Sequence, residues 1–202
     1  MTEELLYLWF GMISRMTHTV KMNVAMKYGG IRGLWNTSEE QLRDELTQAQ
    51  ADGFLEHRDA GKVAAYAEEL RRNDITYIYP GHKLYPGKLY DIPDPPMLLF
   101  AAGDVDVLAD LDPAVAVVGA RKASVYGREA ANRLSGELAA SGVTIVSGMA
   151  LGIDGAAHRA AMKAGGKTVA VLGSGINVPY PRENYDISVS YTHLTLPTTS
   201  RV

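Results

Sequence analysis

The sequence contains no cysteine among its 202 residues. This absence excludes disulfide bonds and thiolate metal sites, and it is typical of a reducing compartment. The sequence also lacks an apolar run near the roughly 20 residues that span a bilayer. Its N-terminus, MTEELLYLWFGM, has acidic residues where a signal peptide would have basic ones. We therefore expect a cytoplasmic protein with no membrane partner.

A strong excess of charge of either sign is missing too, but the charges are unevenly distributed. The net charge is −3, and it divides into −4 for residues 1–70, −3 for 71–112 and +4 for 113–202. A local basic field attracts polyanions even when the whole protein is acidic. Chance scatter of surface charge explains the same values, so the motifs must decide between the two explanations.

Residues 1–70 have the pattern of a small bundle of short helices joined by glycine turns. Near the start, apolar residues recur at three- and four-residue steps, at Leu5, Leu6, Trp9, Met12 and Ile13. A later helix is predicted to begin after Thr37 or Ser38, which have the character of an N-cap. Because this region is acidic, we favour a packing or protein-contact role over binding to a DNA backbone.

Residues 71–112 are rich in proline and glycine, which prevents a continuous helix. Strands are predicted at 75–79 and 97–100. The region has many tyrosine, leucine and phenylalanine side chains, which are unfavourable in water. We therefore expect a connector that packs along a sheet, and not a free linker.

Residues 113–187 alternate short apolar runs with alanine-rich helical segments. The runs at 115–118, 143–146 and 168–172 each lead into a glycine turn, and helices are predicted at about 127–140 and 154–164. This order indicates an α/β fold class, a Rossmann-like parallel sheet with helices on both faces. The first run should be buried on both faces. Ala130, Leu134 and Leu138 should face the core.

Three predicted strands deliver three turns to one edge of the sheet, where ligands of open parallel sheets bind. The candidate residues at this edge are Gly119, Arg121, Ser147, Gly148, Gly173 and Gly175. Backbone N–H groups at a helix start suit a phosphate, and glycine permits close approach. A guanidinium holds a phosphate by two hydrogen bonds or stacks on a base. Any single turn is explained as a tight connection, whereas three aligned turns in the basic part favour a binding site.

Motifs for catalysis, a cofactor or a metal fail on context. Residues 161–168 match a loose P-loop pattern, but they join a helix to a strand, the reverse of a P-loop. No strand leads into G-x-G-x-x-G, and Ser147 stands where a ribose-binding acid belongs, which argues against a nicotinamide cofactor. Asp154 and His158 form either an acid–base pair or, as we favour, a helix N-cap and its neighbour. We expect a binding protein and not an enzyme.

The last fifteen residues, SVSYTHLTLPTTSRV, change the character of the chain. They are rich in serine and threonine and lack a helical period. We interpret residues 188–202 as non-native sequence and leave them out of the fold prediction, with an exposed tail as the alternative. If they are non-native, the predicted sheet is incomplete.

In these motifs the sequence resembles the DprA/Smf family of DNA-processing proteins. The likeness covers about residues 1–187 and is strongest in VGARKASVYG, SGMALGIDGAAH and GGKTVAVLGSGINVPYPREN. It implies a small SAM-like helical domain, then a Rossmann-like domain that binds single-stranded DNA, protects incoming DNA and helps to load the RecA recombinase in natural transformation. It also implies homodimerisation and, in many members, a C-terminal winged-helix domain, although neither part is recognisable after Ile187.

The resemblance also implies a binding site. It makes Arg121 the arginine of the first turn and Lys167, in the G-G-K-T segment, a second DNA contact. The turn glycines and Ser147 shape the pocket, while Tyr126 or Tyr180 is available to stack on bases. The alternative is a nucleotide-binding enzyme of the lysine-decarboxylase-like type, which hydrolyses nucleoside monophosphates. Its P-G-G-x-G-T turn and paired acid are absent before the last fifteen residues. A nucleotide-sensing module is a third reading.

Overall fold

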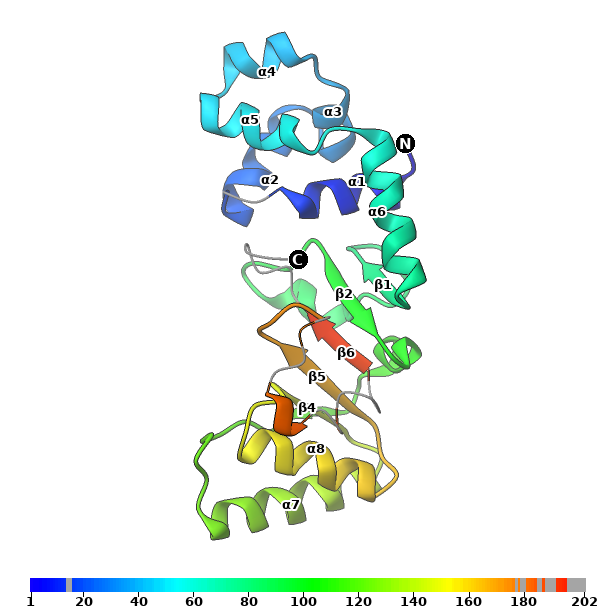
Figure 1. Ribbon diagram of the computed structural model, residues 1–202, viewed down its shortest axis with the longest axis vertical. Helices are drawn as coiled ribbons and strands as arrows, with labels where there is room; N and C mark the ends of the chain where they lie inside the picture. Colours follow the sequence, from blue (N-terminus) through cyan, green and yellow to red (C-terminus); the bar gives the residue numbers. More distant parts are fainter. Residues whose placement is uncertain (14–15, 177, 179–180, 185–186, 188–191, 196–202) are drawn as a thin grey trace. The chain divides into compact units, whose positions relative to one another are not determined.

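The computed structural model describes residues 1–13, 16–176, 178, 181–184, 187 and 192–195 and divides into two compact units (Figure 1). The first comprises Met1–Pro80 and Gly87–Leu98, and the second comprises Gly81–Pro86 and Leu99–Val202. The predicted connector is therefore shared between the two units. No helix in the described ranges has the length and apolar character needed to cross a bilayer.

The first unit is helical, as predicted. Its helices are α1 (Glu3–Met12), α2 (His18–Lys27), α3 (Ile31–Asn36), α4 (Glu39–Glu45), α5 (Gln48–Glu56) and α6 (Ala60–Arg72), followed by strand β1 (Ile75–Ile78) and the 3-10 helix η1 (Gly87–Asp91). Polar side chains cap the N-termini of several of these helices. Ser38 accepts a hydrogen bond from Gln41 N, which confirms it as the N-cap of α4, and Thr47 and Asp59 cap α5 and α6 in the same way.

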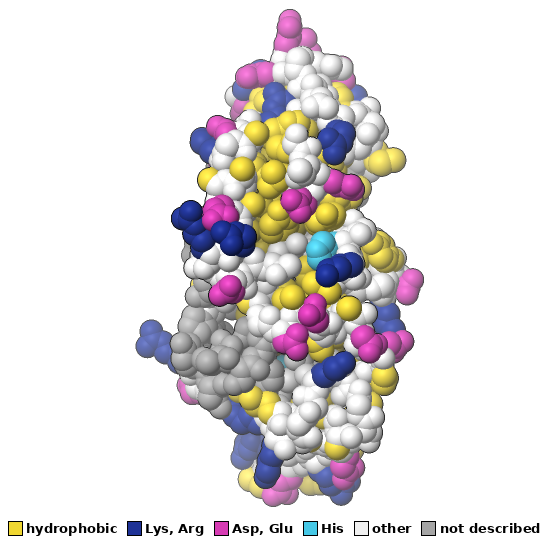
Figure 2. All heavy atoms as spheres, turned by 90° about the vertical axis from the view of Figure 1, so that its right-hand side faces the viewer, with side chains coloured by type: hydrophobic (Ala, Val, Ile, Leu, Met, Phe, Trp, Pro, Cys, Tyr) yellow, Lys and Arg dark blue, Asp and Glu magenta, His cyan; other side chains and the backbone are white. Residues whose placement is uncertain are grey.

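The core of the helical unit surrounds Trp9, whose ring meets Trp35 edge-on at 4.9 Å. Leu8 and Phe10 are fully buried, whereas the predicted core residues Leu5 and Met12 are only partly buried. Helix α1 packs against both α3 and α6, so its buried surface is wider than a single stripe. On the face seen in Figure 2, basic and acidic side chains of this unit alternate around an apolar area.

The second unit is an α/β domain, which confirms the predicted fold class. Its elements are β2 (Leu99–Ala102), η2 (Val105–Asp110), β3 (Ala114–Ala116), α7 (Val125–Ala140), β4 (Thr144–Ser147), α8 (Ile153–Lys163), β5 (Thr168–Leu172), η3 (Arg182–Asn184) and β6 (Thr192–Thr195). Strands in this unit follow the order β2-β6-β5-β4-β3. All neighbours are parallel except β2 and β6.

Strand β6 lies inside the segment that the sequence analysis excluded from the fold. It pairs in parallel with β5, where His193 is opposite Ala170, and antiparallel with β2. The polar, threonine-rich composition gave no strand signal for it. That residues 188–202 are non-native stays a prediction.

Helices α7 and α8 lie side by side on one face of the sheet (Figure 1), so these two helices do not provide the predicted cover on both faces. Strands β3, β4 and β5 are adjacent in chain order, so the two right-handed crossovers run in the same direction and place both helices on the same side. The predicted inner face of α7 is confirmed for Leu138, which packs against the core cluster around Ala139 and Ile145, but it is wrong for Leu134. Ala131, Ser135 and Ala139 are buried, while Leu134 is 51% exposed, because α7 approaches α8 through small residues.

Strand β3 does not have the double burial that its apolar run predicted. It is the last strand of the sheet order, and Val115 and Val118 are 39% and 70% exposed. Its register with β4 is regular, with Val115 opposite Ile145. The prediction failed because an apolar run does not reveal whether neighbours cover it. In the described part of the chain, only β4 pairs with this strand.

Candidate nucleic-acid interface

The three parallel strands β3, β4 and β5 end at the same edge of the sheet, which we call the turn edge. The structure brings six of the predicted site residues there, Gly119, Arg121, Ser147, Gly148, Gly173 and Gly175, because each follows or ends one of these strands. Lys167 is not among them. It precedes β5, where its carbonyl accepts a hydrogen bond from Ile145 N, and it therefore lies at the opposite edge.

The first turn, after β3, is the open part of the turn edge. Gly119, Arg121 and Lys122 are all exposed, and Ser124 caps α7 by accepting a hydrogen bond from Gly127 N at 3.1 Å. Gly127 N is bonded to Ser124, whereas the N–H groups of Val125 and Tyr126 precede the first intrahelical bond and follow two basic residues closely in the sequence. This arrangement suits an anion such as a phosphate.

An aromatic side chain stands next to this basic turn. Tyr126, in the first turn of α7, is 81% exposed. The Arg128 guanidinium donates a hydrogen bond to Ala123 O and thereby links the loop to the helix. Tyr180, the other predicted stacking residue, lies outside the described residues. Charge and one exposed ring are therefore present together at the first turn.

The second turn is occupied by contacts within the protein. Ser147 is buried, and its hydroxyl donates a hydrogen bond to Val117 O at 2.6 Å. The Asp154 carboxylate accepts the N–H of Gly148 at 3.1 Å. These two predicted ligand groups therefore hold neighbouring elements together, and this leaves the first turn as the main open surface.

Glycine residues let the first turn and the start of α8 approach each other closely. Gly152 has φ 82°, and a Cβ there would lie 2.2 Å from Ala120 O and 2.6 Å from Arg121 O. A Cβ at Gly119 would meet Ile153 Cγ1 at 2.7 Å. Ile153 N donates to Ala120 O at 3.3 Å. The first turn thus rests on the N-terminus of α8, and sequence reasoning missed Gly152.

Asn184 is a second support that the sequence did not reveal. It is 2% exposed, and its Nδ2 donates to Met149 O at 2.8 Å and to Ala150 O at 3.0 Å. Its Oδ1 accepts a hydrogen bond from the Arg159 guanidinium at 2.9 Å. Met149 has φ 58°, a conformation that a non-glycine residue rarely adopts without support. The amide of Asn184 therefore holds the second turn in a strained shape.

We expect Asn184→Ala to lower the free energy of unfolding by about 2–3 kcal/mol, because two largely enclosed carbonyls lose their donor. The control is Asn132→Ala, an exposed asparagine of α7, whose effect should stay within about 0.5 kcal/mol. Urea unfolding followed by circular dichroism measures both. Equal midpoints for the two variants would show that Asn184 does not hold the turn.

Asp154 and His158 do not form an acid–base pair. The carboxylate of Asp154 binds Gly148 N, and Nδ1 of the buried His158 lies 2.8 Å from Thr168 Oγ1. That hydroxyl gives its only proton to Ile145 O, so His158 must donate to it from Nδ1. The favoured reading as an N-cap is also wrong for Asp154. The N-cap of α8 is Gly152, and Asp154 is the second residue of the helix.

The third turn and η3 complete the turn edge. Gly173 is exposed, and a Cβ there would meet nothing within 4 Å. Asn184 joins η3 to the second turn, which brings the exposed Arg182 of η3 to this edge as well. Arg182 is therefore a basic residue that sequence reasoning missed. The sequence feature that could have revealed it is the P-R-E-N stretch, in which Arg182 stands two residues before Asn184.

The sequence matches a known protein family. The family described as DNA recombination-mediator protein A matches residues 76–194, more than half of the chain. The chain therefore belongs to this family, the DprA/Smf proteins, as its motifs had indicated.

Several known proteins of this family are similar to the chain in sequence. DNA processing protein DprA of Bacillus subtilis is 40% identical over 126 residues, which are 62% of this chain and 41% of that protein. Protein Smf of Escherichia coli is 41% identical over 141 residues, 66% of this chain and 37% of that protein. The chain thus spans about two fifths of the length of these relatives.

Solved structures agree with the fold. The X-ray structure of DprA from Streptococcus pneumoniae superposes with a TM-score of 0.73 at 27% identity, over 96% of this chain and 68% of that one. A structure of DprA from Helicobacter pylori superposes with a TM-score of 0.52 at 29% identity, over 60% and 54% of the two chains. The latter was described for its single-stranded DNA binding mode.

Proposed function

We propose that this chain binds single-stranded DNA at the turn edge, with the first turn as the main contact. The observation that supports this most directly is the exposed group of Arg121, Lys122 and Tyr126 at the start of α7. The single-stranded DNA binding described for the Helicobacter pylori relative supports the same ligand.

The chemistry of the first turn suits a single strand. Arg121 and the first N–H groups of α7 hold phosphates, and the ring of Tyr126 stacks on a base. These contacts read no base edge, so binding should weaken with salt and show little sequence preference. Gly119, Ser147, Gly148, Gly173 and Gly175 shape the edge and keep the turns in place.

A second, wider proposal concerns what a full-length member of the family does. We propose that such a protein acts in the cytoplasm, protects incoming DNA, helps to load RecA and forms a homodimer. Adding RecA to oligo-dT coated with single-strand-binding protein, with and without the full-length protein, tests the loading step. Unchanged RecA filament formation would contradict it.

We propose binding and not catalysis at the turn edge. The two titratable groups nearest to a catalytic pair, Asp154 and His158, each have a separate structural partner. The nucleoside monophosphate hydrolase alternative predicts release of free base from a mononucleotide, measured by chromatography. Release that persists in the purified protein and is lost with Asp154→Asn would favour the enzyme.

Substitutions of Arg182 and Lys167 test whether DNA contacts the turn edge or the lysine that the motif predicted. We expect Arg182→Ala to weaken oligo-dT binding about three- to tenfold, because Arg182 is exposed at the turn edge. Lys167→Ala should change the affinity by less than about twofold, because Lys167 lies at the opposite edge of the sheet. Fluorescence anisotropy at fixed low salt measures both. A larger effect at Lys167 would restore it as the principal second contact.

A further inference from the structure

Strand β3 has an open side in the described part of the chain. On its other side, Val117 N donates to Val146 O of β4 at 2.9 Å. The backbone groups of successive residues in a strand point alternately to its two sides. Because Val117 faces β4, its neighbours at alternate positions face away. These are Ala114, Ala116 and Val118, and no described residue bonds their N–H or C=O groups. We call this row of backbone groups the β3 edge.

The β3 edge lacks the features that keep exposed strands apart. Natural edge strands bear a charge, a bulge, or a proline whose missing N–H lies on the open side. Residues 114–118 are Ala-Val-Ala-Val-Val, and their register with β4 is regular. Pro113 does not protect the edge, because its carbonyl accepts a hydrogen bond from Thr144 N and it therefore faces β4. Such an uncharged edge is suited to pairing with another strand.

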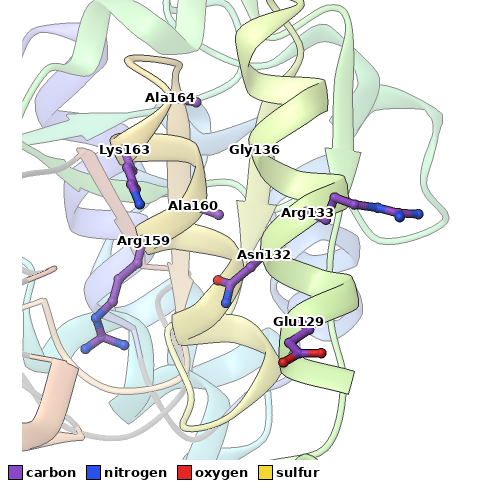
Figure 3. A pocket seen from close by; sticks show the side chains of 8 residues that line it. All are labelled: Glu129, Asn132, Arg133, Gly136, Arg159, Ala160, Lys163 and Ala164. Atoms are coloured by element: carbon purple, nitrogen blue, oxygen red, sulfur yellow. The ribbon is translucent and has the colours of Figure 1, made fainter. Parts of the chain in front are cut away.

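The groove between α7 and α8 is a different kind of surface. Figure 3 shows that charged side chains of both helices line it, among them Glu129, Arg133 and Lys163. Residues 114–118 of the β3 edge include no charged side chain. A partner at this edge must therefore be apolar and must offer backbone donors and acceptors, as a β-strand does.

Charges of opposite sign lie at the two ends of β3. Asp110 and Asp112 come before the strand, Arg121 and Lys122 come after it, and all four are exposed. An antiparallel strand with the same pattern places its acidic end beside the basic end of β3, and its basic end beside the acidic end. A parallel strand with this pattern would place like charges together, which is unfavourable. The charges thus match a second copy of β3 in the antiparallel orientation.

We propose that two copies of this chain pair through their β3 edges, antiparallel and related by a two-fold axis at Ala116. In this register Ala116 lies opposite Ala116 of the partner subunit, and Ala114 lies opposite Val118 of the partner subunit. Each outward N–H then meets an outward C=O, as in the hydrogen-bonded pairs of an antiparallel ladder. The contact is self-complementary, as two-fold symmetry requires. It does not rest on the proposed DNA site.

Sedimentation velocity of the full chain, from about 1 to 300 µM and without DNA, tests the pairing. A contact of this small size should have a dissociation constant of roughly 10–100 µM. Val118→Lys puts a charge on the β3 edge and should weaken association about tenfold or more. Met26→Lys, on α2, is the matched control and should leave association unchanged, since Met26 and Val118 are 71% and 70% exposed.

An exchange of charges gives a result that partial unfolding does not reproduce. Asp110→Lys and Lys122→Asp should each weaken association about threefold or more, because each brings like charges together at the ends of the paired strands. The double variant has opposite charges again, in exchanged positions. Its dissociation constant should return to within about twofold of that of the unchanged chain.

Amide hydrogen exchange locates the contact. The N–H groups of Ala114, Ala116 and Val118 should exchange more slowly at high protein concentration than at low concentration. Val117 N–H should change little, because it is already bonded to β4. A chain that stays monomeric at about 300 µM would overturn the proposal. A dimer that Val118→Lys leaves intact, or whose β3 edge amides gain no protection, would overturn it as well.

Discussion

Replacing Arg121 by alanine is expected to weaken binding to oligo-dT by roughly 10- to 100-fold. The estimate follows from losing a charge-assisted hydrogen bond to a phosphate, worth about 1.5–3 kcal/mol. Arg121 is exposed at the end of β3, beside the start of α7, with no described salt bridge to compete for its charge. Each phosphate contact also releases counterions, so the salt dependence should become shallower by about 0.7 for a single strand.

The matched control for Arg121→Ala is Arg133→Ala. It removes the same charge from an exposed site within α7, away from the turn edge. Fluorescence anisotropy over a salt series should show less than about a twofold change for this control. Similar losses in both variants would mean that overall charge, and not the first turn, determines binding. Tyr126→Ala should lower the affinity without altering the salt slope, since stacking releases no counterion.

Replacing Gly152 by alanine is expected to have the largest effect on stability. The backbone there has φ 82°, and the new Cβ would lie 2.2 Å from Ala120 O and 2.6 Å from Arg121 O. Backbone atoms cannot rotate away as a side chain does. Left-handed strain of about 1–2 kcal/mol and overpacking of about 1–3 kcal/mol together give a loss of about 2–5 kcal/mol.

Gly152→Ala should also reduce DNA binding, because any relief of the collision moves the carbonyl of Arg121. Gly173→Ala is the matched control, since its Cβ would meet nothing within 4 Å and its backbone is not left-handed. Urea unfolding should place Gly173→Ala within about 0.5 kcal/mol of the unchanged protein. A Gly152 variant as stable as the Gly173 variant would show that the first turn does not rest on α8.

Several features of the fold could be predicted because their causes are local. The strands before each glycine turn, the helix predicted at about 127–140 and the N-cap at Ser38 depend on apolar period, backbone φ and side chains within about four residues. Parallel strands then had to bring their turns to one edge. Arg121 followed from this pattern, and the structure places it there.

Other features were mispredicted because their causes lie far away in the chain. An apolar run cannot show that β3 is an edge strand, and alanines gave no sign that α7 would turn Leu134 outward. Lys167 lies at the start of β5, as its place in the sequence had indicated, and its role as a second DNA contact stays a prediction. Strand β6 had no apolar period to reveal it.

The sequence by itself determined the order of β3, β4 and β5 with their turns and helices, and the basic first turn that follows β3. Only the tertiary structure decided which turn groups are open to a ligand. The Asp154 carboxylate accepts a hydrogen bond from Gly148 N, and the carbonyl of Val117 accepts one from the Ser147 hydroxyl. The Asn184 amide donates to a carbonyl 35 residues earlier in the chain. A hydrogen-bonding group serves one partner well at a time, and packing between distant segments assigned these groups to the protein itself.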